Sequence, residues 1–101
     1  MPTDTRAEVV VYGDEALISL HGELDLFSLH VLEEALRDAH GASRVVIDLQ
    51  AVDFLDCAAL RRIERAAKAS AVEGRMLRVD HASGIVRRLL DILKLDDLTV
   101  R

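Results

Sequence analysis

The stretch "VVIDLQAVDFLDCAALRRI", residues 45–63, decides the fold. It begins with a nearly continuous run of β-branched and aliphatic residues, which is typical of a strand in the middle of a sheet. It then passes without a linker into a segment where Leu60, Ile63 and Ala67 recur at helical spacing. Asp56 stands at the junction, and Asp is a common cap of helix N-termini. The sequence therefore predicts a covered strand that leads directly into a helix.

The segments on either side extend this pattern into alternating strands and helices. Upstream, "AEVVVYGDEALISLHG" is typical of two strands around a turn at residues 13–15, and Ala16, Ile18 and Leu20 share one face of the second. The other predicted elements are helices at 28–41, 57–74 and 83–94 and strands at 44–49, 75–79 and 98–100. Strands separated by helices pair in parallel through right-handed crossovers. We therefore predict one α/β domain over residues 1–101, with a mixed sheet, about three helices and the order β-β-α-β-α-β-α, with or without a closing strand at 98–100. Residues 1–6 are expected to be frayed.

Two helices carry predicted boundaries. Ser28 is the expected N-cap of the first helix, and Gly41 is its expected stop. Ser83 is the expected N-cap of the last helix. The inward face of that helix is predicted from helical spacing to hold Ile85, Leu89, and Ile92 or Leu93.

Composition excludes several functional classes. The chain has 101 residues, of which 50% are apolar and only 3% aromatic, so its core must be aliphatic. A formal net charge of −5 argues against nucleic-acid binding through phosphate contacts. One cysteine permits no internal disulfide. The N-terminus lacks a signal-peptide pattern, and no apolar run approaches the ~20 residues that span a bilayer. We expect a cytoplasmic protein without direct membrane insertion.

The polar residues indicate neither an enzyme nor a metal protein. The four histidines share no ligand spacing with Cys57, and the chain contains no P-loop, dinucleotide fingerprint or nucleophile elbow. We expect no metal and no cofactor. The acidic pairs at 33–34 and 96–97 are interpreted as solvated helix and turn residues. Cys57 is interpreted as a buried, inert thiol, although a helix start can lower a thiol pKa. A redox or enzymatic role for it is the alternative.

Three motifs together resemble the STAS family, the sulfate-transporter and anti-sigma-factor-antagonist domain. They are "HGELDLFS" at 21–28, the opening stretch at 45–63, and "RRLLDILKLDDL" at 87–98. The similarity runs from about residue 8 to residue 98, with the elements in matching order. Its joint signal is G-E-L-D after the second strand followed by D-x-x-G-L at the start of the second helix, a motif that reads D-C-A-A-L in this chain.

The resemblance implies a protein-binding regulatory function. In anti-sigma-factor antagonists the second motif is typically D-S-[ST]-G-L, and its second hydroxyl residue accepts phosphate from a serine kinase with the histidine-kinase-like ATPase fold. That kinase is also the anti-sigma factor. The unphosphorylated antagonist binds it and releases the sigma factor, whereas a phosphate adds roughly −2 charge and abolishes binding.

Two departures from that motif change the expectation for this chain. Asp56 matches the motif Asp, Cys57 the first small residue, Ala58 the acceptor, Ala59 the Gly and Leu60 the Leu. Ala58 has no hydroxyl, so the usual phosphorylation is expected to be absent. Ala59 adds a methyl where the resemblance places the partner, and it favours helix over Gly by up to ~1 kcal/mol. Asp25 matches the acidic residue of G-E-L-D, which lies near the acceptor loop in the family.

The resemblance also predicts a partner-binding surface. It comprises Asp25, Leu26, Phe27, Asp56, Cys57, Ala58, Ala59, Arg61, Arg62 and Arg65. The second helix is expected to expose Arg61, Arg62, Arg65 and Lys68, with the acidic Glu64 among them. These residues form either a docking patch for an acidic partner or an ordinary solvated face. The loop at 25–28 is expected beside Asp56. Leu26 or Phe27 is exposed there as an apolar anchor, or both are core residues.

The expected partner is an anti-sigma factor with the histidine-kinase-like ATPase fold. Two alternatives need the same shape without the serine: a STAS-only scaffold of a stress-signalling assembly, and a small subunit of a lipid-transport ABC complex. The sequence leaves open whether the chain forms a homodimer.

Overall fold

All strands of the computed structural model, which describes residues 4–95 and 98–101, belong to one five-stranded sheet. The elements in chain order are β1 (Arg6–Tyr12), β2 (Glu15–Leu24), the short 3₁₀-helix η1 (Leu26–Ser28), α1 (Leu29–Asp38), β3 (Arg44–Leu55), α2 (Cys57–Val72), β4 (Met76–Asp80), α3 (Gly84–Leu93) and β5 (Thr99–Val100). The strands lie in the order β1-β2-β3-β4-β5, with β1 antiparallel to β2 and the other neighbours parallel. The predicted fold class, a mixed α/β sheet with three helices, is confirmed.

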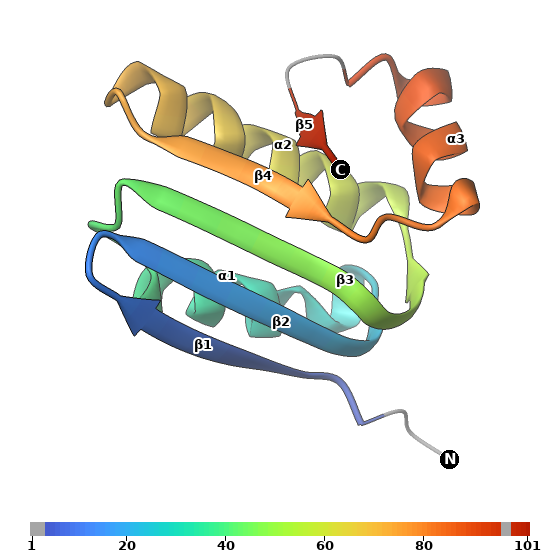
Figure 1. Cartoon of the computed structure of the whole chain (residues 1–101). Coiled ribbons are helices and arrows are strands. Elements are labelled where there is room, and N and C mark those ends of the chain that lie inside the picture. The colour runs from blue at the N-terminus through green and yellow to red at the C-terminus, as the bar shows by residue number, and fades with distance from the viewer. Residues whose placement is uncertain (1–3, 96–97) are drawn as a thin grey trace.

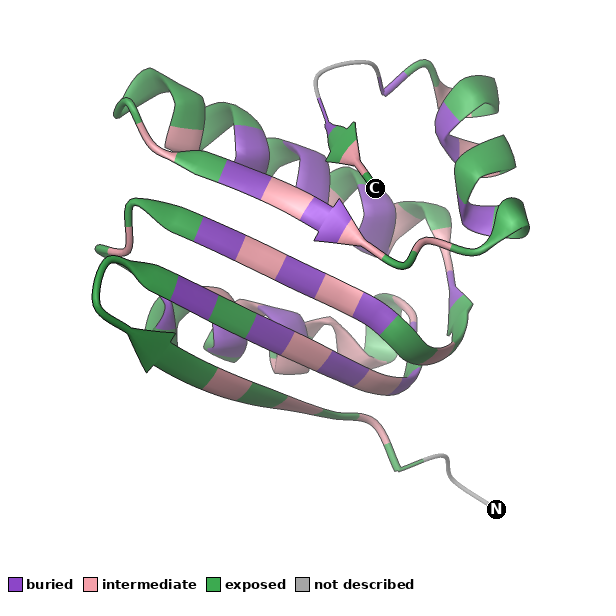
Figure 2. Ribbon diagram, viewed as in Figure 1, coloured by how far each residue is buried: buried purple, intermediate pink, exposed green. Residues whose placement is uncertain are grey.

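The helices leave one face of the sheet uncovered. In Figure 1, α1 and α2 lie behind the sheet, α3 stands beside the β4–β5 end, and the face toward the viewer carries no helix. β3 lies between β2 and β4, as its β-branched sequence predicts. Every second residue is buried along β2 and along β3 as far as Leu49, and Figure 2 shows this as alternating bands. The alternation places the core between the sheet and the helices.

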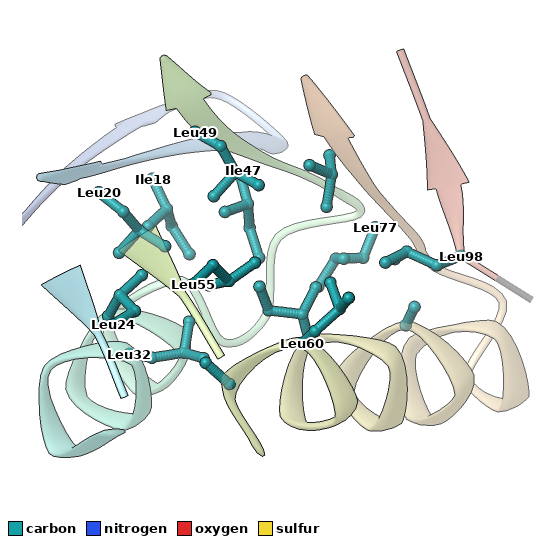
Figure 3. Packing of buried hydrophobic residues seen from close by; sticks show 14 of the residues in the cluster. Ile18, Leu20, Leu24, Leu32, Ile47, Leu49, Leu55, Leu60, Leu77 and Leu98 are labelled. Carbon is teal, nitrogen blue, oxygen red and sulfur yellow. The ribbon is translucent and has the colours of Figure 1, made fainter. Parts of the chain in front are cut away.

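The core is aliphatic. Ala16, Ile18 and Leu20 of β2 are buried together, which confirms the predicted inward face of that strand. Leu60 and Ile63 of α2 are fully buried against it. Figure 3 shows leucine and isoleucine side chains from the strands meeting those of the helices. This packing of the strands against the helices fixes the junction between β3 and α2, where the predicted site lies.

The N-terminal segment begins the sheet earlier than predicted. Thr5 Oγ1 donates to the carbonyl of Glu23 at 2.8 Å, and Arg6 pairs with His21 in the β1–β2 ladder. The predicted fraying of residues 1–6 is therefore wrong for residues 5 and 6, while residues 1–3 lie outside the described residues. Asp96 and Asp97, expected in a solvated turn, also lie outside them.

The faces and caps of two helices differ from prediction. Ser28 makes no side-chain hydrogen bond to cap α1, and that helix ends at Asp38, three residues before Gly41. In α3, Ser83 does cap the helix by accepting from the Val86 N–H at 3.2 Å. The buried residues of α3 are Val86 and Leu90, whereas Ile85 and Ile92 are exposed. Apolar residues occupy most positions of α3, so spacing alone could not select the face that packs.

Gly22 is required by a close backbone approach. Its φ is +88°, and a Cβ at this position would lie 2.9 Å from the carbonyl oxygen of Asp4. Gly41 has a similar φ of +99° but open space around it. Both Gly→Ala variants incur the cost of a positive φ, so their difference isolates the clash. We expect Gly22→Ala to lower the free energy of unfolding by about 1 kcal/mol more than Gly41→Ala. Urea denaturation measures both, and equal losses would show that the Asp4 contact does not constrain the strand.

The uncovered face carries a charge pair on β4. Arg78 Nε donates to Asp80 Oδ1 at 2.9 Å. This hydrogen bond lowers the pKa of the Asp80 carboxyl below its ordinary value and raises the pKa of Arg78. The pair therefore contributes stability at pH values above the pKa of an unfolded Asp, and this contribution is lost as the pH falls through the lower folded value.

Within residues 4–95 and 98–101, no helix is long and apolar enough to cross a membrane.

Candidate functional site

Asp56 joins the two segments that the sequence predicted to lie together. Its Oδ1 accepts from the Ala59 N–H at 2.9 Å, which caps the N-terminus of α2. Its Oδ2 accepts from the Leu26 N–H at 3.1 Å, across 30 residues of sequence. The backbone N–H of Asp56 donates to the carbonyl of Leu24 at 3.0 Å. One carboxylate thus holds the start of α2 against η1, and the predicted proximity of the 25–28 loop to Asp56 is confirmed.

Asp25 builds the second half of the site by capping η1. Its Oδ1 accepts from the N–H groups of Phe27 at 2.9 Å and Ser28 at 3.0 Å. In return, the Ser28 hydroxyl accepts from the Asp25 N–H at 3.0 Å, and it lies 2.9 Å from the carbonyl of Glu23, to which it donates. This reciprocal arrangement is a capping box. Ser28 therefore stabilises η1 rather than capping α1, a role that only the three-dimensional turn reveals.

Two large apolar side chains project from η1 into solvent. Leu26 is 64% exposed and Phe27 is 88% exposed. The sequence left open whether either would be exposed or both buried, and the structure exposes both. Asp25 and Asp56 each accept a hydrogen bond from a backbone N–H of this turn. The Leu26 and Phe27 side chains therefore project from a backbone that is held in place. An exposed aromatic on a fixed backbone is a common anchor of protein interfaces.

The first turn of α2 exposes different residues from those predicted. Cys57 is exposed, so the predicted buried thiol is wrong. Ala58 is half-buried, and Ala59 is fully buried. Ala59 therefore does not present its methyl to a partner, because the helix turns that side chain into the core. The surface at this helix start consists of Cys57 and the methyl of Ala58.

The basic residues of α2 separate into two groups. Arg61 and Arg65 are exposed, and neither makes an ion pair with another described residue. Arg62 is half-buried and donates through Nε to Glu33 of α1 at 2.5 Å, so it ties the two helices together. Glu64 is buried, and its carboxylate lies 3.6 Å from the Lys68 ammonium. The prediction of an exposed Glu64 is therefore wrong, and Arg62 has a structural partner that sequence spacing could not indicate.

The described residues contain no group of three or more histidine, cysteine or acidic side chains arranged to hold a metal ion. The site itself brings together Asp25, Leu26 and Phe27 from one segment and Asp56, Cys57 and Ala58 from another. Arg61 and Arg65 follow one and two turns along α2. Both aspartates are engaged by backbone N–H groups, so their chemistry is that of caps. The arrangement presents apolar and cationic groups on a rigid backbone, which suits binding of another macromolecule.

Comparison with known proteins places this geometry in a family. A family model described as "STAS domain" matches residues 6–100. An anti-sigma factor antagonist from Mycobacterium paratuberculosis matches with a TM-score of 0.76 and 23% identity, covering 96% of this chain and 85% of that chain. TM1081 from Thermotoga maritima matches with a TM-score of 0.81 and 18% identity, covering 93% and 84%.

The anti-sigma factor antagonist SpoIIAA matches in two forms. Its unphosphorylated form gives a TM-score of 0.74 at 13% identity, covering 96% of this chain and 86% of that chain. Its phosphorylated form gives 0.72 at 14%, covering 96% and 90%. The chain also matches Mglu with a TM-score of 0.67 at 24% identity, over 78% of this chain but only 20% of the length of Mglu. At these identities the solved structures establish the fold.

Proposed function

The chain belongs to the STAS domain family, and from this premise we propose that it is a cytoplasmic, protein-binding regulatory module of the anti-sigma-factor-antagonist type. Its partner is an anti-sigma factor with the histidine-kinase-like ATPase fold. It catalyses no reaction, and it stays unphosphorylated at the usual position because Ala58 stands there. The observation that carries this proposal is a combination of two features. The exposed apolar turn η1 is held by hydrogen bonds to Asp25 and Asp56, and the start of α2 beside it has no hydroxyl.

The apolar turn supports the choice of a protein partner. Leu26 and Phe27 are exposed beside Asp56, and two carboxylates hold the backbone between them. A turn whose backbone is already fixed loses little backbone entropy on binding, so burial of its apolar side chains contributes more to affinity. The backbone around it is fixed by contacts inside this chain, so the turn needs no partner to form.

The cations of α2 support a partner of acidic surface charge. Arg61 and Arg65 are exposed without an ion pair in the described chain, although its formal net charge is −5. A local cationic strip on an acidic protein restricts the orientations in which an acidic partner surface can approach. These side chains flank the α2 start, so the same partner contacts them and Phe27 together.

Phosphorylation tests the role of Ala58 directly. Incubation of the purified chain with the cognate kinase and ATP is expected to leave it without phosphate, because position 58 carries only a methyl. Ala58→Ser restores the missing oxygen at the second residue of α2 and is expected to accept close to one phosphate per chain. Intact mass and peptide mapping measure both. Stoichiometric phosphate on the unmodified chain, for example at Ser28 of η1, or an Ala58→Ser variant that takes up none, would contradict the proposal.

A second candidate function follows from the same missing hydroxyl. A STAS-only scaffold of a stress-signalling assembly, or a small subunit of a lipid-transport ABC complex, needs the docking shape and no phosphorylation. Affinity purification of the tagged chain separates the candidates: an anti-sigma kinase supports the first proposal, and a large homologous assembly or a transporter ATPase supports the second.

A further inference from the structure

α3 exposes an apolar stripe on its solvent side. Val86 and Leu90 anchor the helix in the core, while Ile85 is 76% exposed and Ile92 is 66% exposed. The two isoleucines are seven residues apart, so they lie on one side of the helix about two turns, or ~10 Å, from each other. Leu89, half-buried, lies between them. A stripe of this kind on a ten-residue helix is unusual for a surface that only meets water.

A small apolar pocket opens beside the N-terminal half of this stripe. β4 pairs with β3 only as far as Asp48, so the last residues of β3 run past the end of β4. There Val52 and Phe54 face Ile85 and Leu89 across a pocket of about 120 Å³ with a mainly apolar lining. Phe54 remains 52% exposed at its rim. The pocket is large enough to admit an aliphatic side chain.

The charges next to the stripe are self-complementary. Arg88 borders it, and Asp91 follows one turn later on the same flank of α3. Both are exposed, and neither makes an ion pair with another residue in the part of the chain that the structure describes. One helix therefore carries a pocket at its N-terminal half, an apolar knob at its C-terminal half, and one charge of each sign.

We propose that two copies of this chain associate through α3, packed antiparallel, with Ile92 of each copy inserted into the pocket of the other. A two-fold axis near Leu89 places Ile92 of one copy beside Ile85 and Phe54 of the second. The same axis places Ile92 of the second copy beside Ile85 and Phe54 of the first. The same alignment brings Arg88 within reach of Asp91 of the second copy. One short helix with its pocket buries less than the ~800 Å² per partner of a standard interface, so the dimer is weak and reversible.

Sedimentation equilibrium of the full chain tests the dimer without any partner protein, so its result is independent of the proposed function. From about 10 µM to about 1 mM, we expect the mass to rise from monomer toward dimer, as a weak interface requires. Ile92→Glu is expected to raise the dissociation constant at least tenfold, because a carboxylate cannot enter the apolar pocket. Val72→Glu, at a site 88% exposed near the end of α2, is the matched control and is expected to leave association unchanged.

A charge exchange identifies the register. Arg88→Asp alone and Asp91→Arg alone each place like charges across the axis, and both are expected to weaken self-association. Their equimolar mixture pairs opposite charges again and is expected to form heterodimers at least as well as the original chain. A monomer at every concentration, or a dimer that survives Ile92→Glu, would overturn the proposal. Loss of capture of a different protein by Ile92→Glu, with no change in mass, would assign the stripe to that protein instead.

Discussion

Replacing Phe27 with alanine is expected to weaken capture of the anti-sigma partner by about 30-fold or more, which corresponds to ~2 kcal/mol. The ring is 88% exposed, so it contributes little to folding and its contact area is available for binding. The backbone that carries it is fixed by hydrogen bonds from its own N–H to Asp25 and from the Leu26 N–H to Asp56. Isothermal calorimetry with the kinase-type anti-sigma factor measures the loss, and urea denaturation is expected to show unchanged stability.

Tyr12→Ala is the matched control for that variant. Tyr12 is also an aromatic, 83% exposed, but it lies at the end of β1 by the β1–β2 turn. It is expected to leave partner affinity unchanged. If both variants lowered affinity equally, or if neither did, the binding surface would not be centred on η1.

Asp56→Ala is expected to lower the free energy of unfolding by about 1–2 kcal/mol, since α2 loses its N-cap. The Ala59 N–H loses its acceptor at a half-buried helix start. The Leu26 N–H is solvent-accessible and can bond water instead, so it adds little to the loss of stability. Its loss matters for binding, because η1 is then no longer held against α2. Partner affinity is expected to fall by more than the small increase in unfolded chains would explain.

Asp53→Ala separates a general charge effect from this specific role. Asp53 lies three residues earlier, on β3, and is exposed; its side chain makes no hydrogen bond or ion pair with another described residue. It removes the same charge without removing a cap. Thermal unfolding and calorimetry of both variants compare them, and equal effects would show that Asp56 acts only through its charge.

Sequence reasoning predicted the elements more accurately than the orientation of their surfaces. The order of strands and helices, the inward face of β2 and the cap at Asp56 were all predictable, because each depends on residues that are close in sequence. The exposure of Cys57 and the burial of Ala59 were not predicted. Neighbouring positions on a helix point about 100° apart, so a small rotation of α2 against the sheet decides which side chain reaches solvent.

Hydrogen-bond partners that are far apart in the sequence could not be predicted either, because tertiary packing decides which of them meet. Arg62 pairs with Glu33, and Leu26 bonds Asp56, at separations of 29 and 30 residues. No periodicity links such positions. An approximate prediction was possible only where the family resemblance supplied one, as it did for the approach of Asp25 to the α2 start.

By itself, the sequence determined the α/β class, the aliphatic core and the absence of a hydroxyl at position 58, because periodicity, composition and residue identity are local properties. Only the tertiary structure decided which apolar residues stay outside. η1 and α3 each have more apolar side chains than their contact with the sheet can cover, so packing buries Val86 and Leu90 and leaves Phe27, Ile85 and Ile92 in solvent. The way the elements meet decides which apolar side chains are buried. Those that stay exposed are the ones we expect to bind other chains: Phe27 a partner protein, and Ile85 and Ile92 a second copy of this chain.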